Sequence, residues 1–531
     1  MPTNAPSHTP TKSPAWTAAV GASLRLSLAA RIRLLGNERH WAANTAGLQL
    51  SQLRQNLTRA KNTEFGKRHD FAKLIELDNT ELLDAYRKAL PPRDWYAFAD
   101  DIKRMREGGE PDILWPGKVR DFAQTSGTTA GDKFIPVTQD MLASNRRAAL
   151  DIFAHLHRFG VSLPKLTSGK LLFLGGCSDI EESSVGTRTA DLSGLVAPLI
   201  RWPLSEVYSP GPDIALLDHW PTKIEAMAKR CIDQDIRFVS GMPSWTTVLF
   251  QRIIELANER GQAATCVKDV WPNLTALIHG GVNYAPFAPR IARLWSGSAD
   301  TDIPHRHELY PASEGFIALQ DRAGDPGLRL LADIGNFYEF IPLEQIDDDN
   351  PPAFTPDQCE PGQRYVVCMT TCAGLYRYII GDVVEFDTRP APLRTKPTAE
   401  HGPARLRIVG RHRHFINAFG ENLIVEHIER AVAHAAGAAD IEVGEFTAAP
   451  VYPSETNRAG LELAIEVPPS ADPRALEHFA EAFDARLKAE NVDYTTKRTD
   501  SLGMAPPTLR PLPPGTFHRW LDSMGKLGGQ H

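Results

Sequence analysis

Residues 125–133 read T-S-G-T-T-A-G-D-K, from Thr125 to Lys133. Two glycines and four hydroxyl residues in seven positions suit a loop whose backbone N–H groups approach phosphate oxygens, while the hydroxyls add donors and Lys133 adds a positive charge. The spacing does not match the G-x-x-x-x-G-K-[ST] pattern of a Walker A loop. On composition alone, a phosphate-binding loop and an ordinary Ser/Thr/Gly turn are about equally good interpretations.

Two later stretches carry residues that suit a nucleotide site. Residues 310–315 read Y-P-A-S-E-G, where Glu314 could be a magnesium ligand beside phosphate, because Mg²⁺ takes one or two carboxylates plus phosphate oxygens. Residues 374–382 read G-L-Y-R-Y-I-I-G-D, where Asp382 could accept the hydroxyls of a ribose and Arg377 could neutralise phosphate. Taken singly, a solvated turn and a strand that ends in a Gly-Asp turn are the simpler interpretations.

A fourth stretch, residues 410–422, reads G-R-H-R-H-F-I-N-A-F-G-E-N. Arg411, Arg413 and two glycines suit a hinge that presents polar groups to a bound nucleotide. A basic surface loop between two domains fits the composition equally well.

The four stretches, in this order, resemble those of the adenylate-forming superfamily, and more closely those of the auxin-responsive (Gretchen Hagen type) acyl acid amido synthetases. The segment F-Y-E-F-I-P at 337–342 and the ending from Gly515-Thr516-Phe517 to Gly528-Gly529-Gln530-His531 are also typical of that group. The resemblance extends from about Ala43 to the last residue.

The resemblance implies a role for individual residues. The residues expected to bind the ATP phosphates, and then AMP, are Ser126, Gly127, Thr128 and Thr129. Tyr310 and Ser313 would line the nucleotide pocket, Glu314 would bind Mg²⁺, and Asp382 would bind the ribose hydroxyls. Gly281 and Val282 would belong to the loop near the adenine, and the hinge would lie between Arg411 and Arg413.

The sequence departs from the family's pattern in two places. Arg413 stands where the superfamily often has an acidic residue, and Asn417 stands where it often has a lysine. The family also tends to place a catalytic lysine just after the sequence that matches Gln530-His531. Lys526 is the nearest candidate here, but it does not occupy the matched position.

The implied function is an ATP-dependent acid–amine ligase with Mg²⁺ as cofactor. A carboxylic acid would be activated as acyl-AMP with release of pyrophosphate, and an amine, expected to be an amino acid, would then displace AMP. Two alternatives stay open: an acyl-CoA-type ligase of the same superfamily, and a non-catalytic nucleotide-binding homologue. His279-Gly280-Gly281 resembles the oxyanion loop of esterases, but the sequence has no G-x-S-x-G nucleophile elbow, so a serine hydrolase is disfavoured. The histidines of His305-Arg306-His307 are interpreted as surface residues rather than metal ligands.

The fold class expected is α/β, with a large N-terminal domain of mixed βα sheets and a small β-barrel-like part, followed by a smaller, mobile α/β C-terminal domain. Short apolar strands that end in glycine, at 171–174, 237–240 and 274–278, alternate with helical segments as parallel βα units do. Asp472-Pro473 predicts a helix from there to about residue 490. The expected division is a disordered N-terminus at 1–17, a large domain at 18–408 with its β-rich part at about 328–388, and a small domain at 409–531.

Composition limits the partners. The 531 residues carry a net charge of −7, which argues against nucleic acid or an anionic membrane as the main partner. Six cysteines without C-x-x-C spacing favour reduced thiols and a cytoplasmic protein. No apolar run reaches the length of a membrane span, and a monomer is the default expectation.

Overall fold

The computed structural model of the chain contains two compact units. The larger contains the residues up to Ile380 together with Glu385–Arg407, and the smaller contains Gly381–Val384 with Ile408–Leu527. The structure describes residues 14–524 except 126–132, 176–179, 197–199, 201, 218–219, 282–283, 286, 413–422, 424, 452–459, 492–493, 496–497 and 499–503. Within these ranges, no helix combines the length and the apolar character that crossing a membrane requires.

The described residues up to Glu107 of the larger unit are mainly helical. The helices are α1 (Thr17–Ser27), α2 (Ala29–Leu35), α3 (Glu38–Ala60), α4 (Glu64–Arg68), α5 (Phe71–Leu74), α6 (Asn79–Ala89), the 3-10 helix η1 (Trp95–Phe98) and α7 (Ala99–Glu107). Thr17, predicted to end a disordered segment, is fully buried at the start of α1, and residues 1–13 lie outside the described part.

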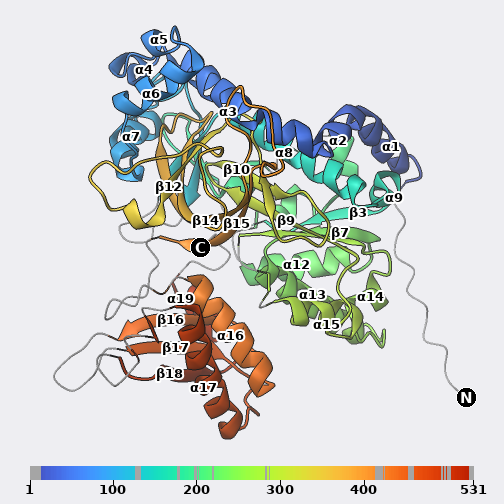
Figure 1. The fold of residues 1–531 in the computed structure, drawn as a ribbon. Helices are drawn as coiled ribbons and strands as arrows, with labels where there is room; N and C mark the ends of the chain where they lie inside the picture. Colours follow the sequence, from blue (N-terminus) through green and yellow to red (C-terminus); the bar gives the residue numbers. More distant parts are fainter. Residues whose placement is uncertain are drawn as a thin grey trace, which may run out of the picture. The chain divides into compact units, whose positions relative to one another are not determined.

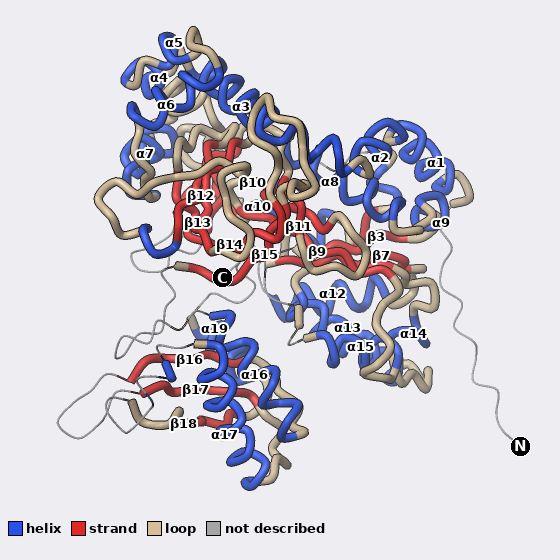
Figure 2. Tube along the Cα trace, viewed as in Figure 1, coloured by secondary structure: helices blue, strands red, loops and turns tan. Residues whose placement is uncertain are grey.

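Most strands of the larger unit join one eleven-stranded mixed sheet (Figures 1 and 2). Its order is β12-β13-β14-β15-β11-β10-β9-β8-β7-β3-β6. The strands are β3 (Lys170–Phe173), β6 (Tyr208–Ser209), β7 (Ile236–Ser240), β8 (Ala276–Gly280), β9 (His305–Ala312), β10 (Gly315–Gln320), β11 (Leu328–Leu330), β12 (Phe337–Pro342), β13 (Arg364–Thr370), β14 (Tyr378–Thr388) and β15 (Arg405–Arg411).

The parallel half of this sheet confirms the predicted βα units. Strand β7 pairs in parallel with β3 and β8, and β8 pairs in parallel with β9. The helices α8 (Gln139–Arg158) and α9 (Leu163–Thr167) pack on one face of these strands, through apolar contacts that include Ile152, Leu166, Phe238 and Ile278. Figure 1 shows α12 (Trp220–Cys231), α13 (Pro243–Glu259) and α15 (Ala288–Ser296) on the opposite face. Burial on both faces explains why these strands read as continuous apolar runs.

The β-rich part predicted at 328–388 continues the same sheet. Its strands β12 and β13 pair antiparallel, and β11 pairs antiparallel with both β10 and β15. The closure of a barrel is not seen among the described residues and stays a prediction. A second, four-stranded sheet has the order β2-β1-β5-β4 and consists of β1 (Asp121–Thr125), β2 (Lys133–Val137), β4 (Glu181–Glu182) and β5 (Arg188–Ala190).

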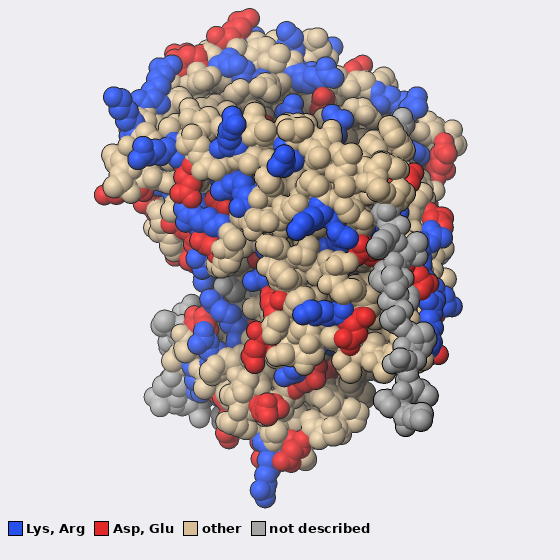
Figure 3. Space-filling model, turned by 90° about the vertical axis from the view of Figure 1, so that its right-hand side faces the viewer, with Lys and Arg blue, Asp and Glu red and all other residues tan. Residues whose placement is uncertain are grey.

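The remaining helices of the larger unit are short. They are α10 (Leu192–Val196), η3 (Leu204–Glu206), α11 (Pro212–Ala215), α14 (Val267–Val270) and η4 (Leu343–Gln345). The five cysteines in the described ranges are all buried and free. On the face drawn in Figure 3, acidic and basic side chains are interspersed.

The smaller unit is an α/β sandwich with its own core. A three-stranded sheet, β16-β17-β18, consists of β16 (Phe446–Val451), β17 (Gly460–Glu466) and β18 (Thr508–Leu512). The helices α16 (Val425–Ala439) and α17 (Pro473–Glu490) supply core side chains such as Val432 and Phe483 against Leu463 and Ile465 of β17. Asp472 caps α17 by accepting from the backbone N–H of Arg474, as the Asp-Pro pair predicts. The last helix described is α19 (Thr516–Ser523).

Candidate nucleotide-binding site

The described residues on either side of the predicted phosphate loop belong to two paired strands, β1 and β2. Strands β1 and β2 pair antiparallel, with Thr125 at the end of β1 opposite Lys133 at the start of β2. The candidate residues Ser126, Gly127, Thr128 and Thr129 lie outside the described part of the chain. Lys133 is half-buried at the first position of β2, and no carboxylate among the described residues pairs with it.

A second hairpin carries Tyr310, Ser313 and Glu314. Ala312 at the end of β9 pairs with Gly315 at the start of β10, so Ser313 and Glu314 form the two-residue turn between them. Tyr310 and Glu314 are nearly buried, with 3% and 6% of their surfaces exposed. The structure thus gathers the three predicted residues of this stretch at one end of one hairpin.

The face of β9 that carries Tyr310 also carries two charged residues that the sequence did not single out. Arg306 and Glu308 alternate with Tyr310 along the strand and therefore share its face. Burial raises the pKa of Glu308 to about 7, and the nearby Arg306 opposes that rise. A carboxyl group that titrates near neutrality beside Tyr310 is an unusual feature of this face.

The end of β8 supports the loop that begins at Gly281. His279 stacks on Tyr284 with ring centroids 4.4 Å apart, and the Arg306 guanidinium lies 4.2 Å from the Tyr284 ring centroid. Burial lowers the pKa of His279 to about 3, so its imidazole stays neutral. Gly281 has a φ of +86°, a backbone conformation that favours glycine. Val282, its predicted partner near the adenine, lies outside the described residues.

Two predicted nucleotide ligands, on strands β14 and β15, pair with each other. The Nε of Arg411, at the end of β15, lies 2.8 Å from the Oδ1 of Asp382 in β14. Gly381, just before Asp382, has a φ of +94°, and its carbonyl accepts a hydrogen bond from the backbone N–H of His412. Asp382 and Arg411 therefore form one charged group on neighbouring strands.

Arg377, suggested for phosphate binding, and Arg188 both pair with carboxylates of the protein. Arg377 is 3% exposed and donates from Nε to Glu339 at 2.8 Å, which contradicts its interpretation as a phosphate-neutralising residue. Arg188 donates to both carboxylate oxygens of Asp121, at 2.7 and 3.0 Å. Both arginines join strands to one another.

Lys526, Arg413 and Asn417 lie outside the described residues, so the lysine assignment and the hinge departures stay predictions. Sequence reasoning gave Arg306, Glu308 and His279 no role in a nucleotide site. The i, i+2, i+4 spacing of Arg306, Glu308 and Tyr310 on a predicted strand was the one signal that could have found two of them.

Comparison with solved structures defines the class of fold. An acyl acid amido synthetase, AtGH3.15, in complex with 2,4-DB matches with a TM-score of 0.73 and 16% identity, over 97% of this chain and 93% of that chain. A 2-hydroxyisobutyryl-CoA ligase in the postadenylation state matches with a TM-score of 0.57 and 14% identity, over 92% of this chain and 94% of that chain. The fold is that of the adenylate-forming enzymes.

Family models give the closer assignment. The GH3 family N-terminal, central and C-terminal domains match residues 37–210, 329–393 and 426–531, which together make up more than half of the sequence. The chain belongs to the GH3 family.

Curated relatives are distant. Jasmonoyl-L-amino acid synthetase GH3.5 of Oryza sativa subsp. japonica is 24% identical over 375 residues, 66% of this chain and 53% of the relative. Indole-3-acetic acid-amido synthetase GH3.4 of Arabidopsis thaliana is 22% identical over 403 residues, 64% of each chain. The matched regions thus span between half and two thirds of the length of these two relatives.

Proposed function

We propose that this protein is an ATP-dependent acid–amine ligase, which activates a carboxylic acid as acyl-AMP and transfers the acyl group to an amino acid. The observation that carries the proposal is the β9–β10 hairpin, whose turn consists of Ser313 and Glu314 and whose strand β9 carries the buried Tyr310, in an adenylate-forming fold. Family membership and the names of the relatives, which are synthetases of jasmonoyl and indole-3-acetic acid conjugates, support an amino acid as the acceptor.

Different residues would bind different parts of the nucleotide. The loop at 126–129 and Lys133 would bind the phosphates, Tyr310 and Ser313 would line the pocket, and Asp382 would bind the ribose hydroxyls. The Asp382 carboxylate is already held by Arg411, so it is oriented before the nucleotide arrives. Gly281 and Val282 would lie near the adenine, where the stacked His279 and Tyr284 support the start of the loop.

Glu314 fits the role of a magnesium ligand. Its carboxylate offers the hard oxygen atoms that Mg²⁺ prefers, and the two-residue turn fixes the position of its backbone. Among the described residues, no three His, Cys, Asp or Glu side chains gather as the ligands of a metal would. Glu314 would therefore hold the ion together with phosphate oxygens, and the ion would neutralise charge that develops on them.

The reaction has two balanced steps. In the first, a carboxylate oxygen attacks the α-phosphorus of ATP, the bond to the β-phosphate oxygen breaks, and pyrophosphate leaves. In the second, the amine nitrogen attacks the acyl carbon, the bond to the AMP oxygen breaks, and the amine loses a proton. The protein's part is to position the reactants and to stabilise the charge on phosphate oxygens. Lys526 remains the candidate for a catalytic lysine in the first step. That the protein is monomeric and cytoplasmic remains a prediction.

Product analysis tests the proposal. The protein is incubated with ATP, Mg²⁺, a panel of carboxylic acids and pooled amino acids, and AMP is separated from ADP. The proposal predicts acid-dependent AMP and pyrophosphate, with a further rise in AMP when amino acids are added. A rise with coenzyme A instead would assign a thioester-forming ligase, and acid-dependent ADP would refute adenylation.

A further inference from the structure

A buried chain of polar groups lies directly behind the turn that carries Glu314. The hydroxyl of Tyr338, in β12, donates a 2.6 Å hydrogen bond to the backbone carbonyl of Phe316, two residues after Glu314. The side-chain amide of Asn336 donates to the Tyr338 hydroxyl at 3.4 Å. Tyr338 and Asn336 are buried, with no more than 1% of either residue exposed.

Further hydrogen bonds fix these two residues in place. The side chain of Gln49, in α3, accepts from the backbone N–H of Tyr338 at 2.7 Å and donates to the carbonyls of Asn336 and Ala332 at 3.1 and 3.0 Å. The Oδ1 of Asn336 accepts from the backbone N–H of Cys372 at 3.2 Å, in the loop between β13 and β14. Three separate parts of the larger unit thus converge on Asn336 and Tyr338.

The turn itself leaves little room for another arrangement. Gly315 has a φ of +143°, and a Cβ atom at this position would lie 2.7 Å from the Nδ2 of Asn336. The pairing of β10 with β9 shifts register between Phe316 and Ala318, which is a bulge. Bulges bend a strand and redirect the side chains next to them, so whatever holds this bulge also sets the direction of the turn.

We propose that Tyr338 and Asn336 are positioning residues that hold the Glu314 turn in the geometry for binding the metal–nucleotide complex. The inference rests on the proposed function, because it takes Glu314 as the magnesium ligand. It also gives a role to the 337–342 segment, which the sequence showed only as typical of the family. Neither side chain would touch substrate, since both act through the backbone of the turn.

The test replaces the Tyr338 hydroxyl and measures metal affinity without catalysis. Mn²⁺ replaces Mg²⁺, and its binding to the full chain is followed by electron paramagnetic resonance in the presence of α,β-methylene-ATP. Tyr338→Phe should weaken Mn²⁺ binding by about three- to ten-fold, the effect expected from the loss of one buried hydrogen bond. In acid-dependent exchange of pyrophosphate into ATP, the same variant should need more Mg²⁺ for half-maximal rate, with the KM for the acid unchanged.

Tyr365→Phe is the matched control. Tyr365, in β13, is equally buried, and its hydroxyl accepts from the backbone N–H of Glu360 and donates to Gln363, away from the turn. This variant should lose similar thermal stability but keep the wild-type metal affinity. If Tyr338→Phe does not fold, Asn336→Ser is measured in the same way and should show the same weakening.

The outcomes separate the two hypotheses. Equal Mn²⁺ affinity in Tyr338→Phe, Tyr365→Phe and wild type, with acid-dependent exchange intact in wild type, would overturn the positioning role alone. Absence of acid-dependent exchange in the wild type would refute the proposed function, and the inference would fall with it.

Discussion

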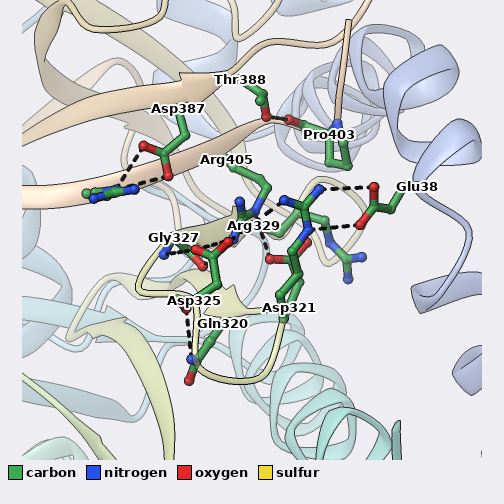
Figure 4. Close-up of polar contacts among 12 residues, drawn as sticks. Glu38, Gln320, Asp321, Asp325, Gly327, Arg329, Asp387, Thr388, Pro403 and Arg405 are labelled. Atoms are coloured by element: carbon green, nitrogen blue, oxygen red, sulfur yellow. Dashed lines mark hydrogen bonds and ion pairs between the residues drawn. The ribbon is translucent and has the colours of Figure 1, made fainter. Parts of the chain in front are cut away.

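Replacement of Arg405 by glutamine should destabilise the larger unit by several kcal/mol. Arg405 lies in β15 among the polar contacts of Figure 4 and donates from Nε to the Oδ1 of Asp321 at 2.9 Å. Its Nη2 lies 2.8 Å from the Oδ1 of Asp325 and donates to the carbonyl of Gly327 at 3.1 Å. The side chains of both Arg405 and Asp321 are only 3% exposed.

The expected cost follows from that burial. Removing the guanidinium takes away the cation that donates to the buried Asp321 carboxylate, and breaking a buried pair in this way costs about 3–5 kcal/mol. Arg407→Gln is the matched control on the same strand. Arg407 pairs with Asp387 at 2.8 Å, but half of its side chain is exposed, so its loss should cost about 1 kcal/mol or less.

Urea unfolding monitored by tryptophan fluorescence measures both variants. The double variant Asp321→Asn with Arg405→Gln should recover part of the lost stability, because it also removes the unpaired charge. Equal unfolding free energies for Arg405→Gln and Arg407→Gln would refute the conclusion that the buried ion pairs of Arg405 link β15 to the β10–β11 turn.

Three further predictions concern single side chains. Asp382→Asn should raise the KM for ATP at least about ten-fold, since hydrogen bonds to a charged group are worth about 1.5–3 kcal/mol; an unchanged KM in pyrophosphate exchange would remove Asp382 from the ribose site. Burial raises the pKa of Glu308 from 4.5 to about 7, so between these pH values the folded protein keeps a proton that the unfolded chain loses. The contribution of Glu308 therefore makes the free energy of unfolding fall as the pH rises from 4.5 to about 7. Glu308→Gln should flatten that fall, and parallel wild-type and variant curves of urea midpoint against pH between 4.5 and 8 would contradict the assignment. Gly280→Ala should lower the free energy of unfolding by about 1–3 kcal/mol, because the alanine Cβ would lie 2.5 Å from the carbonyl oxygen of Leu309. An unchanged melting temperature would contradict this close contact between β8 and β9.

The regular part of the fold was readable because its signals are local. Apolar runs that end in glycine gave β3, β7 and β8 to within a few residues, and the Asp472-Pro473 cap gave the start of α17. Strand β14 continues through Gly381, although a glycine weakens the interior of a strand. The structure keeps one strand, Tyr378–Thr388, with Gly381 at a φ of +94°.

The polar interior could not be read in this way. Arg377 and Glu339 stand 38 positions apart, and Tyr338 and Gln49 stand 289 apart, so no window of sequence contains both partners. His307 was interpreted as a surface residue because arginine precedes it, yet it is fully buried, with its Nε2 bonded to the carbonyl of Gln320. The sequence identified candidate site residues only within motifs that follow one another along the chain. Glu308 was identified from the structure, in which it shares a face of β9 with Tyr310.

Transfer of isotope from the acid to AMP tests the central claim most directly. The protein is supplied with ATP, Mg²⁺, amino acids and a carboxylic acid labelled with ¹⁸O in both carboxylate oxygens, and the products are examined by mass spectrometry. Attack of the carboxylate on the α-phosphorus predicts AMP that carries one ¹⁸O atom, with unlabelled pyrophosphate. Label in inorganic phosphate together with ADP, or amide formation with unlabelled AMP, would contradict an acyl-adenylate.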